Sequence, residues 1–397
     1  MIWVFILAAA LTMTGTVRAE EEPQFLYTAT HTGTLYQYRI GADGTLHSLN
    51  PPGFPISPGA VMLAPHPSGR FPYAVSVHEA NSGHDAAQVF SYRIKPDGTL
   101  APLGYGPRTL AAPADNVTMD PKGRFLFVSG EDDHLFTFRI RHDGALVPLP
   151  DNKDVPTFHI DTQGDGGGEV TGTYNYDSLT FDPAGRFLYL YSVQYGFDSV
   201  SYQFYSFRLD AHGALHPLKS SGGDAEGGTG SIGPCFFTPL GDFLVSHDQG
   251  DKIGTNEFHI GSQGQLTPAR TPFLPKQHAL SVTNGLGGLT LWTSSTDASD
   301  YLHLASYRIG PGSRLTLKSA SAASFLSYGT SAAADRTGRF LYLTPHHQAE
   351  SGHEDYDTLS AYAVTAQGTL RALGTAIPVD GLCGRLNIVS SPTRASR

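Results

Sequence analysis

Cysteine, tryptophan and methionine are scarce in this sequence, which has 2 Cys, 2 Trp and 4 Met among its 397 residues. Two cysteines allow one disulfide at most, so packing must hold the fold instead of a cross-linked framework.

Basic residues are also few. The 26 Lys and Arg face 36 Asp and Glu, the formal net charge is −10, and no run of Lys or Arg is present. Nucleic acid and anionic membranes are therefore poor partners.

Long apolar segments are almost absent as well. Residues 2–13 form the one long apolar stretch, which is shorter than the roughly 20 residues that a membrane-spanning helix needs. Its place at the amino end is typical of a signal peptide, and the small residue Ala19 marks a cleavage site. We therefore predict a signal peptide over 1–19, a single mature domain over 20–397 with no membrane span, and a periplasmic or secreted location.

Glycine, proline and aromatic residues are abundant instead. The chain has 45 Gly, 27 Pro, 19 Tyr and 22 Phe, and only 16% of its residues are charged. Many turns between aromatic strands are typical of β-rich proteins. Single cores stop growing at roughly 250–300 residues, but repeat proteins avoid this limit because each unit packs on its neighbours. The composition and length together favour one repeat domain.

A first repeated turn has the pattern Pro-x-Gly-Arg-Phe. It occurs at 67–71, 121–125 and 183–187, with weaker copies at 239–243, 287–289 and 337–340. Pro and Gly supply the fixed and positive φ angles that a tight reversal needs. The neighbouring segments alternate with a period of two, as residues 135–140 do, which indicates β-strands.

A second repeated turn, Asp-Gly-x-Leu or a close variant, counts the units. Its seven copies lie at 43–46, 97–100, 143–146, 212–215, 263–266, 313–315 and 367–370. Four short strands in a unit of about 50 residues are typical of a propeller blade. The predicted fold is therefore all-β, a seven-bladed β-propeller with four-stranded blades.

The two ends of the repeat predict how the ring closes. The first unit begins at its second strand, 25–30, and residues 386–391 resemble the missing first strand. We expect this C-terminal strand to complete blade 1, because closure removes the unpaired edges of an open ring. In this map Cys235 and Cys383 lie on non-adjacent blades, so we expect no disulfide between them. A disulfide needs Cα atoms about 4.4–6.8 Å apart.

The order Pro-x-Gly-Arg-Phe-Leu-Tyr, Phe-Arg-Ile and Asp-Gly-x-Leu resembles the seven-bladed lactonase family. That family contains bacterial phosphogluconolactonases and fungal muconate-lactonizing enzymes. The resemblance covers roughly residues 25–392. It implies a lactone (carboxylic ester) hydrolase of carbohydrate metabolism that acts on a sugar-type lactone.

Two interpretations of the activity stay open. The family's active site has an inner strand that opens with Pro-Arg-His and a following strand that ends in Asn-Glu. A gap-free alignment of the 66–71 turn puts Ala-Val-Met at 60–62 and Ser-Val at 76–77 in these places. An Arg to polarise the carbonyl and a carboxylate to move a proton are what the chemistry needs. The chain is either an exported lactonase-like hydrolase or a non-catalytic propeller that binds a carbohydrate or protein partner.

Polar residues at the starts of the inner strands predict a site at the mouth of the axial channel. Asp115 and Asn116 open the inner strand of blade 3, Asp177 opens that of blade 4, and Arg385 lies near the equivalent point of blade 1. Asp115, Asp177 and Arg385 are candidate catalytic residues, and Asn116 is a candidate binding residue. The two carboxylates could share a proton or hold a calcium-like cation, or they could cap strand ends. We expect no other cofactor.

Histidine-containing hairpins on the same face supply further candidates. They hold His78 and Glu79 in blade 2, His247 and Asp248 in blade 5, and His346 and His347 in blade 7. Mixtures of His and carboxylate can bind metal or move protons, so the blade 2 pair is a candidate for catalysis and the others for binding. Repeats also copy polar hairpins by descent, and that interpretation stays open. We expect a monomer that takes a small-molecule lactone or a carbohydrate.

Overall fold

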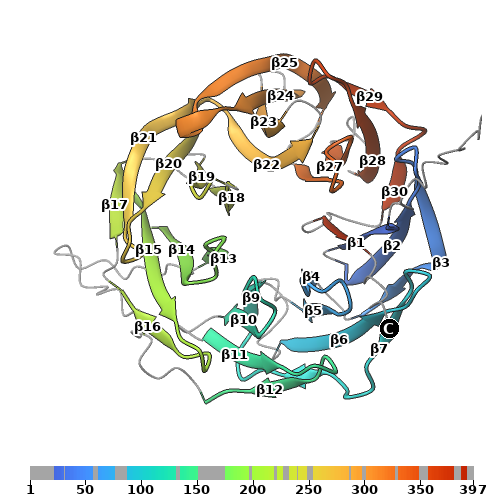
Figure 1. Cartoon of the computed structure of the whole chain (residues 1–397), viewed down its shortest axis with the longest axis vertical. Coiled ribbons are helices and arrows are strands. Elements are labelled where there is room, and N and C mark those ends of the chain that lie inside the picture. The colour runs from blue at the N-terminus through green and yellow to red at the C-terminus, as the bar shows by residue number, and fades with distance from the viewer. Residues whose placement is uncertain are drawn as a thin grey trace, which may run out of the picture.

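A computed structural model of the chain is a ring of β-strands around an axial channel (Figure 1). The described residues are 22–30, 32–56, 61–76, 87–130, 135–150, 175–195, 199–218, 221–226, 232–238, 240–247, 254–285, 288–296, 301–326, 330–347, 356–379 and 386–390. Within these ranges the one helical element is a 3₁₀ turn, η1 (Pro311–Ser313), and no helix is long and apolar enough to cross a membrane. The predicted signal peptide, 1–19, lies outside the described residues.

Seven sheets stand around the channel, each forming one blade with its first strand innermost. From the channel outward, blade 1 has β31 (Asn387–Ser390), β1 (Gln24–Ala29), β2 (Thr34–Ile40) and β3 (Leu46–Pro55); blade 2 has β4 (Val61–Pro65), β5 (Pro72–Ser76), β6 (Gln88–Ile94), β7 (Leu100–Pro102) and β8 (Arg108–Thr109). Blade 3 has β9 (Ala114–Met119), β10 (Phe125–Gly130), β11 (Leu135–Ile140) and β12 (Leu146–Pro148); blade 4 has β13 (Asn175–Phe181), β14 (Phe187–Tyr195), β15 (Ser199–Leu209), β16 (Leu215–Pro217) and β17 (Ser221–Glu226). Blade 5 has β18 (Ile232–Phe237), β19 (Phe243–His247), β20 (Gly254–Ile260) and β21 (Leu266–Pro275). Blade 6 has β22 (His278–Gly285), β23 (Gly288–Thr296), β24 (Tyr301–Ile309) and β25 (Leu315–Leu326); blade 7 has β26 (Thr330–Ala334), β27 (Phe340–His347), β28 (Tyr356–Val364), β29 (Leu370–Ala372) and β30 (Ile377–Val379).

The predicted seven-bladed fold is confirmed, with one refinement in the outermost strands. In blades 2, 4 and 7 the fourth strand is split, since β8, β17 and β30 pair with the same third strand as β7, β16 and β29. In blade 2 the chain between the two pieces contains Gly104 and Gly106 with φ of 76° and 69°. Glycine adopts such angles without steric cost, so the chain can leave the blade edge and return to it.

The C-terminal strand closes the ring as predicted. β31 pairs antiparallel with β1, so that Val389 lies opposite Phe25 and Ile388 opposite Leu26. Val389 is buried in a core cluster that also includes β1 residues. The first strand of blade 1 therefore comes from the far end of the chain, and neither end of the ring presents a free sheet edge.

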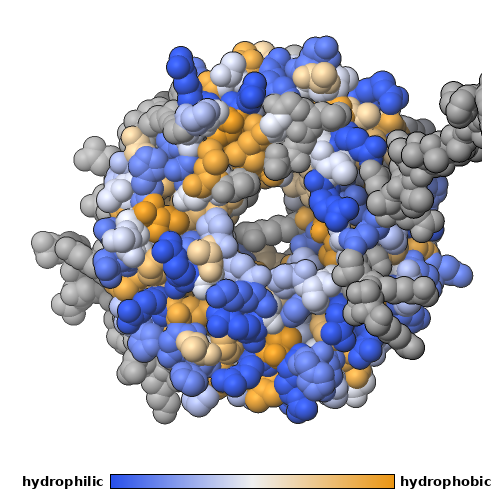
Figure 2. Space-filling view, in the orientation of Figure 1, coloured by the Kyte–Doolittle hydropathy of each residue, from blue (hydrophilic) through white to orange (hydrophobic). Residues whose placement is uncertain are grey.

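The antiparallel order places the connections on two faces. Innermost strands begin, and second strands join third strands, on the face that we call the mouth face. The Pro-x-Gly-Arg-Phe and Asp-Gly turns lie on the opposite face, which we call the turn face. Figure 2 shows the channel opening as a hollow at the centre of the ring.

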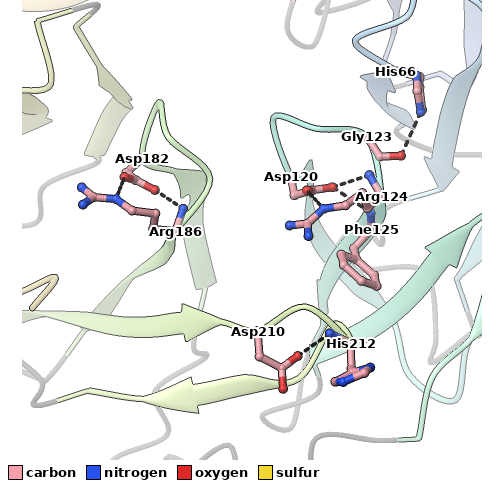
Figure 3. A network of polar contacts seen from close by, with 9 residues as sticks. All are labelled: His66, Asp120, Gly123, Arg124, Phe125, Asp182, Arg186, Asp210 and His212. Atoms are coloured by element: carbon pink, nitrogen blue, oxygen red, sulfur yellow. Dashed lines mark hydrogen bonds and ion pairs between the residues drawn. The ribbon is translucent and has the colours of Figure 1, made fainter.

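An aspartate before the first turn fixes the shape of that turn in blades 3 and 4. Asp120 Oδ1 accepts hydrogen bonds from the backbone N–H groups of Arg124 (2.5 Å) and Phe125 (2.8 Å), as Figure 3 shows. Asp182 makes the same bonds in blade 4. His66 takes this position in blade 2. Each carboxylate satisfies buried backbone donors at the start of strand two.

The two repeated turns meet between neighbouring blades. A tyrosine hydroxyl of one blade donates to the carbonyl of the Asp-Gly glycine in the next blade, which we call a Tyr–Gly contact. The described residues include four: Tyr27 to Gly98 (2.6 Å), Tyr73 to Gly144 (2.9 Å), Tyr189 to Gly264 (2.9 Å) and Tyr342 to Gly44 (3.0 Å). Gly144 has a φ of 88°, and Phe71 occupies the space that a Cβ would need. Only glycine suits this turn.

The hydrophobic core lies between the blades. One cluster joins Tyr73 and Val75 of blade 2 to Val117, Leu126 and Val128 of blade 3, all buried. Equivalent clusters join other neighbouring blades. Each blade is therefore stabilised by the blades on either side of it, as in other repeat proteins.

Candidate functional site

The innermost strands of blades 3 and 4 begin with β-bulges on the mouth face. In blade 3, Ala114 lies opposite Gly130 and Asn116 opposite Ser129, so Asp115 is an extra residue without a cross-strand partner. A bulge changes the direction of a side chain and often occurs beside active sites. The backbone therefore makes Asp115 an exception in an otherwise regular strand.

Blade 4 repeats this irregularity at the second predicted carboxylate. Asn175 lies opposite Val193 and Ser178 opposite Tyr191, so the pair Tyr176 and Asp177 contains one residue more than the partner strand. Both acidic residues that the sequence suggested for the mouth lie in such bulges. Because β9 contacts β13, the two bulges belong to adjacent innermost strands.

Blades 5 and 6 have bulges at the same level, whereas blades 2 and 7 do not. In blade 5 the shift lies between Ile232 and Cys235, and in blade 6 it lies between Ala279 and Ser281. The described pairs of β4 with β5 and of β26 with β27 run without a shift. The described part of the mouth is therefore asymmetric, with four consecutive irregular blades, and of these four bulges those of blades 3 and 4 contain an aspartate.

The described polar groups near these bulges are buried. Asn116 is 2% exposed, and its Oδ1 accepts a hydrogen bond from the Val117 N–H at 2.9 Å. Ser129, on the partner strand, is 1% exposed. The side chains of Asp115 and Asp177 lie outside the described part of the structure, so the predicted approach of their carboxylates and a ligand role for Asn116 stay predictions.

At the mouth face of blade 7, His347 forms an ordered aromatic pair. Its ring stacks on that of Tyr356 with centroids 4.7 Å apart and an interplanar angle of 17°. His347 Nε2 lies 2.9 Å from the Thr358 hydroxyl, which fixes the ring. Tyr356 is 54% exposed. An exposed aromatic ring held in one orientation can pack against the apolar face of a sugar ring or another flat ligand.

The remaining sequence candidates are placed by their backbone or not at all. His247 ends β19 opposite Ile232, and His346 lies opposite Asp357 in the β27–β28 pair, both at the mouth face. The other candidates lie outside the described residues; they are His78, Glu79, Asp248 and Arg385. Cys235 is buried and Cys383 is also outside the described residues, so the thiol prediction stays open.

Within the described residues, no group of three or more His, Cys, Asp and Glu side chains is placed to hold a metal ion. The predicted calcium-like cation would use Asp115 and Asp177, whose side chains are not among those described. A cation at the mouth therefore stays a prediction.

One polar cluster that the sequence did not reveal lies on the turn face between blades 5 and 6. The Ser313 hydroxyl donates to Asp242 Oδ2, and Asp242 Oδ1 lies 2.8 Å from His259 Nδ1. The three residues come from separate turns and strands of two blades, so no local motif contains them. The weak turn copies at 239–243 and 313–315 were the one available signal, since both depart from the repeat at this junction.

Comparison with solved structures finds similar propellers in bacteria. One is a provisionally named 6-phosphogluconolactonase from Bacteroides fragilis, with a TM-score of 0.61 and 16% identity over 94% of this chain and 99% of that one. Another, from Bacteroides uniformis and provisionally named in the same way, has a TM-score of 0.59 and 16% identity over 93% and 100%. A Lactobacillus plantarum protein matches with a TM-score of 0.59 and 16% identity, again over 93% and 100%. At this identity, the similarity establishes the fold.

No protein-family model matches the chain, and no curated protein matches it in sequence.

Proposed function

We propose that this protein is a lactonase-like hydrolase that opens a sugar-type lactone at the mouth of the channel, between blades 3 and 4. The observation that carries the proposal is the pair of bulges on adjacent innermost strands at Asp115 and Tyr176–Asp177. The provisional lactonase names of two propellers that share this fold over nearly the whole chain support the same reaction.

The proposed reaction needs a base and a group that stabilises negative charge. One carboxylate, from Asp115 or Asp177, would take a proton from water as the water oxygen attacks the lactone carbonyl carbon. The ring C–O bond would then break, and the leaving oxygen would regain a proton to give a hydroxy acid. Arg385, or a cation bound by the carboxylates, would stabilise the oxyanion. If the carboxylates are close, mutual repulsion should raise the pKa of one of them.

Acid release from a panel of sugar lactones at fixed pH tests the proposal. We expect the wild type to hydrolyse at least one lactone and the double variant Asp115→Asn/Asp177→Asn to lose this activity, because the amides keep the shape but not the charge. Asp143→Asn is the matched control, since Asp143 lies in a partly exposed Asp-Gly turn on the opposite face. A wild type inactive on the whole panel, or a fully active double variant, would contradict the proposal.

A second function is favoured by the blade 7 aromatic pair. The exposed Tyr356 ring, ordered by His347, supports a non-catalytic role in which the mouth face binds a carbohydrate. Carbohydrate binding that is lost in Tyr356→Ala but retained in Asp115→Asn/Asp177→Asn would favour this role over hydrolysis. Binding retained in Tyr356→Ala would exclude the aromatic pair as its site.

Export of a monomer is part of the proposal. Cleavage after Ala19 would deliver residues 20–397 to the periplasm or the medium. Mass spectrometry of the protein recovered from those fractions should give a chain that begins at Glu20, and its size in solution should be that of one chain. Uncleaved protein confined to the cytoplasm would contradict this part.

A further inference from the structure

The turn face has two arginines in each of several blades, and both lie beside the same phenylalanine. One arginine precedes the phenylalanine of the first turn, as Arg124 precedes Phe125. The other lies opposite that phenylalanine on strand three, as Arg139 lies opposite Phe125. Arg39 and Arg208 occupy the strand-three position in blades 1 and 4. The repeat therefore places arginines at regular intervals around the turn face of an acidic protein.

In blades 2 and 3 both guanidinium groups lie over one ring. The guanidinium carbons of Arg70 and Arg93 lie 4.8 Å and 5.7 Å from the centroid of Phe71. The corresponding distances from Arg124 and Arg139 to Phe125 are 5.2 Å and 5.8 Å. Each contact lies within the range of a cation–π interaction. The ring orders both side chains and leaves N–H groups at the guanidinium edges that can bind a ligand.

Blade 2 differs from blades 3 and 4 because its turn lacks a carboxylate. Arg124 pairs with Asp120 at 2.9 Å, and Arg186 pairs with Asp182 at 3.2 Å (Figure 3). In blade 2 the aspartate position is His66. Among the described residues, neither Arg70 nor Arg93 has a carboxylate at ion-pair distance.

Neither His66 nor the aspartate of the turn over Phe71 forms an ion pair with these two arginines. His66 Nδ1 accepts a hydrogen bond from the Ser68 N–H, and its Nε2 lies 2.9 Å from the Gly123 carbonyl, an arrangement that suits the neutral ring. Burial lowers the pKa of His66. Asp143, beside the glycine that covers Phe71, lies 3.7 Å from Arg141 instead. Two positive charges therefore share one ring, no farther apart than about one Debye length, ~10 Å at 0.1 M salt.

We propose that Arg70 and Arg93 form an anion-binding site on the turn face and that, with the arginines of the neighbouring blades, they bind an acidic polysaccharide. Guanidinium edges bind carboxylate and sulfate groups through paired N–H···O bonds. A bound anion also relieves the repulsion between the two like charges. Arg39 on one side and Arg139 on the other extend the site to blades 1 and 3. This proposal does not depend on the proposed hydrolase activity, which belongs to the opposite face.

The charge of the whole molecule favours a thin polymer over a broad anionic surface. The chain has a net charge of −10, so a membrane or a nucleic-acid duplex would meet repulsion from the rest of the protein. A single polysaccharide strand is narrow, so it can contact these arginines while covering less of the acidic molecule than a membrane or a duplex would.

Affinity measured against salt tests the proposal on the mature protein. The probes are polygalacturonate, which offers carboxylates, dextran sulfate, which offers sulfates, and uncharged dextran. We expect binding to one or both charged polymers and not to dextran. Arg70→Gln/Arg93→Gln should weaken binding about tenfold and lower the slope of log affinity against log salt by about 2, because two counterion-releasing contacts are lost.

Two further variants keep this experiment decisive. Arg371→Gln removes an exposed arginine of β29 that stacks on no phenylalanine in the described residues, and it should bind like the wild type. Arg70→Lys/Arg93→Lys keeps both positive charges and should retain the wild-type slope of log affinity against log salt. This variant still tests the site if Arg70→Gln/Arg93→Gln fails to fold. Wild-type affinity in the double Gln variant overturns the proposal. So does equal binding to uncharged dextran, or a preference for phosphatidylserine–phosphatidylcholine vesicles over both charged polymers.

Discussion

The junction of blades 2 and 3 and the junction of blades 5 and 6 use the same places in the repeat but different chemistry. In the first, the buried hydroxyl of Tyr73 donates to the carbonyl of Gly144. In the second, Val245 lies two residues after Phe243, where Tyr73 lies two residues after Phe71, so no phenol is available at this position. The Ser313 hydroxyl of blade 6 donates instead to Asp242 of blade 5.

The two junctions therefore use different side chains to connect neighbouring blades. At each of these two junctions one polar bond holds the turn of one blade against the next blade, and it involves a phenol in the first and a carboxylate in the second. The carboxylate version has a cost, because Ser313 adopts a φ of 52°, which is unfavourable for a residue other than glycine. The phenol version needs glycine at the turn. Each junction is therefore sensitive to a different substitution.

The largest effect should follow from Gly144→Ala at the first junction. An added Cβ would lie 2.7 Å from Phe71 and 2.8 Å from Leu103, on a backbone with a φ of 88°. Strain and overpacking together should reduce stability by about 3 kcal/mol. Gly104→Ala is the control, because Gly104 has a φ of 76° but no atom within 4 Å of an added Cβ. Equal shifts in the thermal unfolding midpoint would mean that packing against Phe71 is unimportant.

Asp242→Ala should break the second junction with a smaller effect, about 2 kcal/mol, because the buried Ser313 hydroxyl loses this acceptor. His259→Ala removes only the other partner, whose side chain is 58% exposed, and should cost about 0.5 kcal/mol. Chemical denaturation of both variants, of Ser313→Ala and of the double variant Asp242→Ala/Ser313→Ala measures the coupling between Asp242 and Ser313. Additive effects of Asp242→Ala and Ser313→Ala would argue against a direct bond.

Tyr73→Phe should cost about 1 kcal/mol, since the ring keeps its packing and only the bond to the Gly144 carbonyl is lost. Tyr105→Phe serves for comparison, because Tyr105 is 50% exposed and its hydroxyl contacts Asp143 at 3.3 Å. Its unfolding midpoint should stay close to that of the wild type. A neutral Tyr73→Phe would indicate that water replaces the phenol.

The smallest effect concerns the stability of the fold at alkaline pH. Burial raises the pKa of Tyr73 and of Tyr342, so both phenols stay protonated in the folded state at pH values where they ionise in the unfolded chain. Their contribution is fully present below pH 10 and declines as the pH rises beyond about 10. The unfolding midpoint of Tyr73→Phe should therefore fall less steeply than that of the wild type from pH 9 upward. Parallel curves would exclude this linkage.

The architecture was predictable because the turns require particular residues. The Asp-Gly turn needs a positive φ at its glycine, so each copy reports one blade, and the segment 386–391 matched the missing strand of blade 1. The contacts between blades were not predictable, since Tyr73 and Gly144 are 71 residues apart and belong to separate motifs. Docking of neighbouring blades explains why these motifs recur together.

The candidate site was predictable only in outline. The sequence identified Asp115 and Asp177 at the starts of inner strands, but a bulge depends on the register with a partner strand, which no local pattern reveals. The second arginine beside Phe71 was hidden for the same reason, because Arg93 reaches that ring from another strand. Single motifs therefore located residues without showing which of them meet.

The order in which the strands are made has a consequence for biosynthesis. β1 is the first described strand to be synthesised and β31 is the last, yet the two are neighbours in blade 1. At a translation rate of roughly 5–20 residues per second, the growing chain stays an open arc for about twenty seconds or more. The channel mouth does not exist during that time. A chain that terminates before β31 lacks the innermost strand of blade 1, so its ring and its channel mouth stay incomplete.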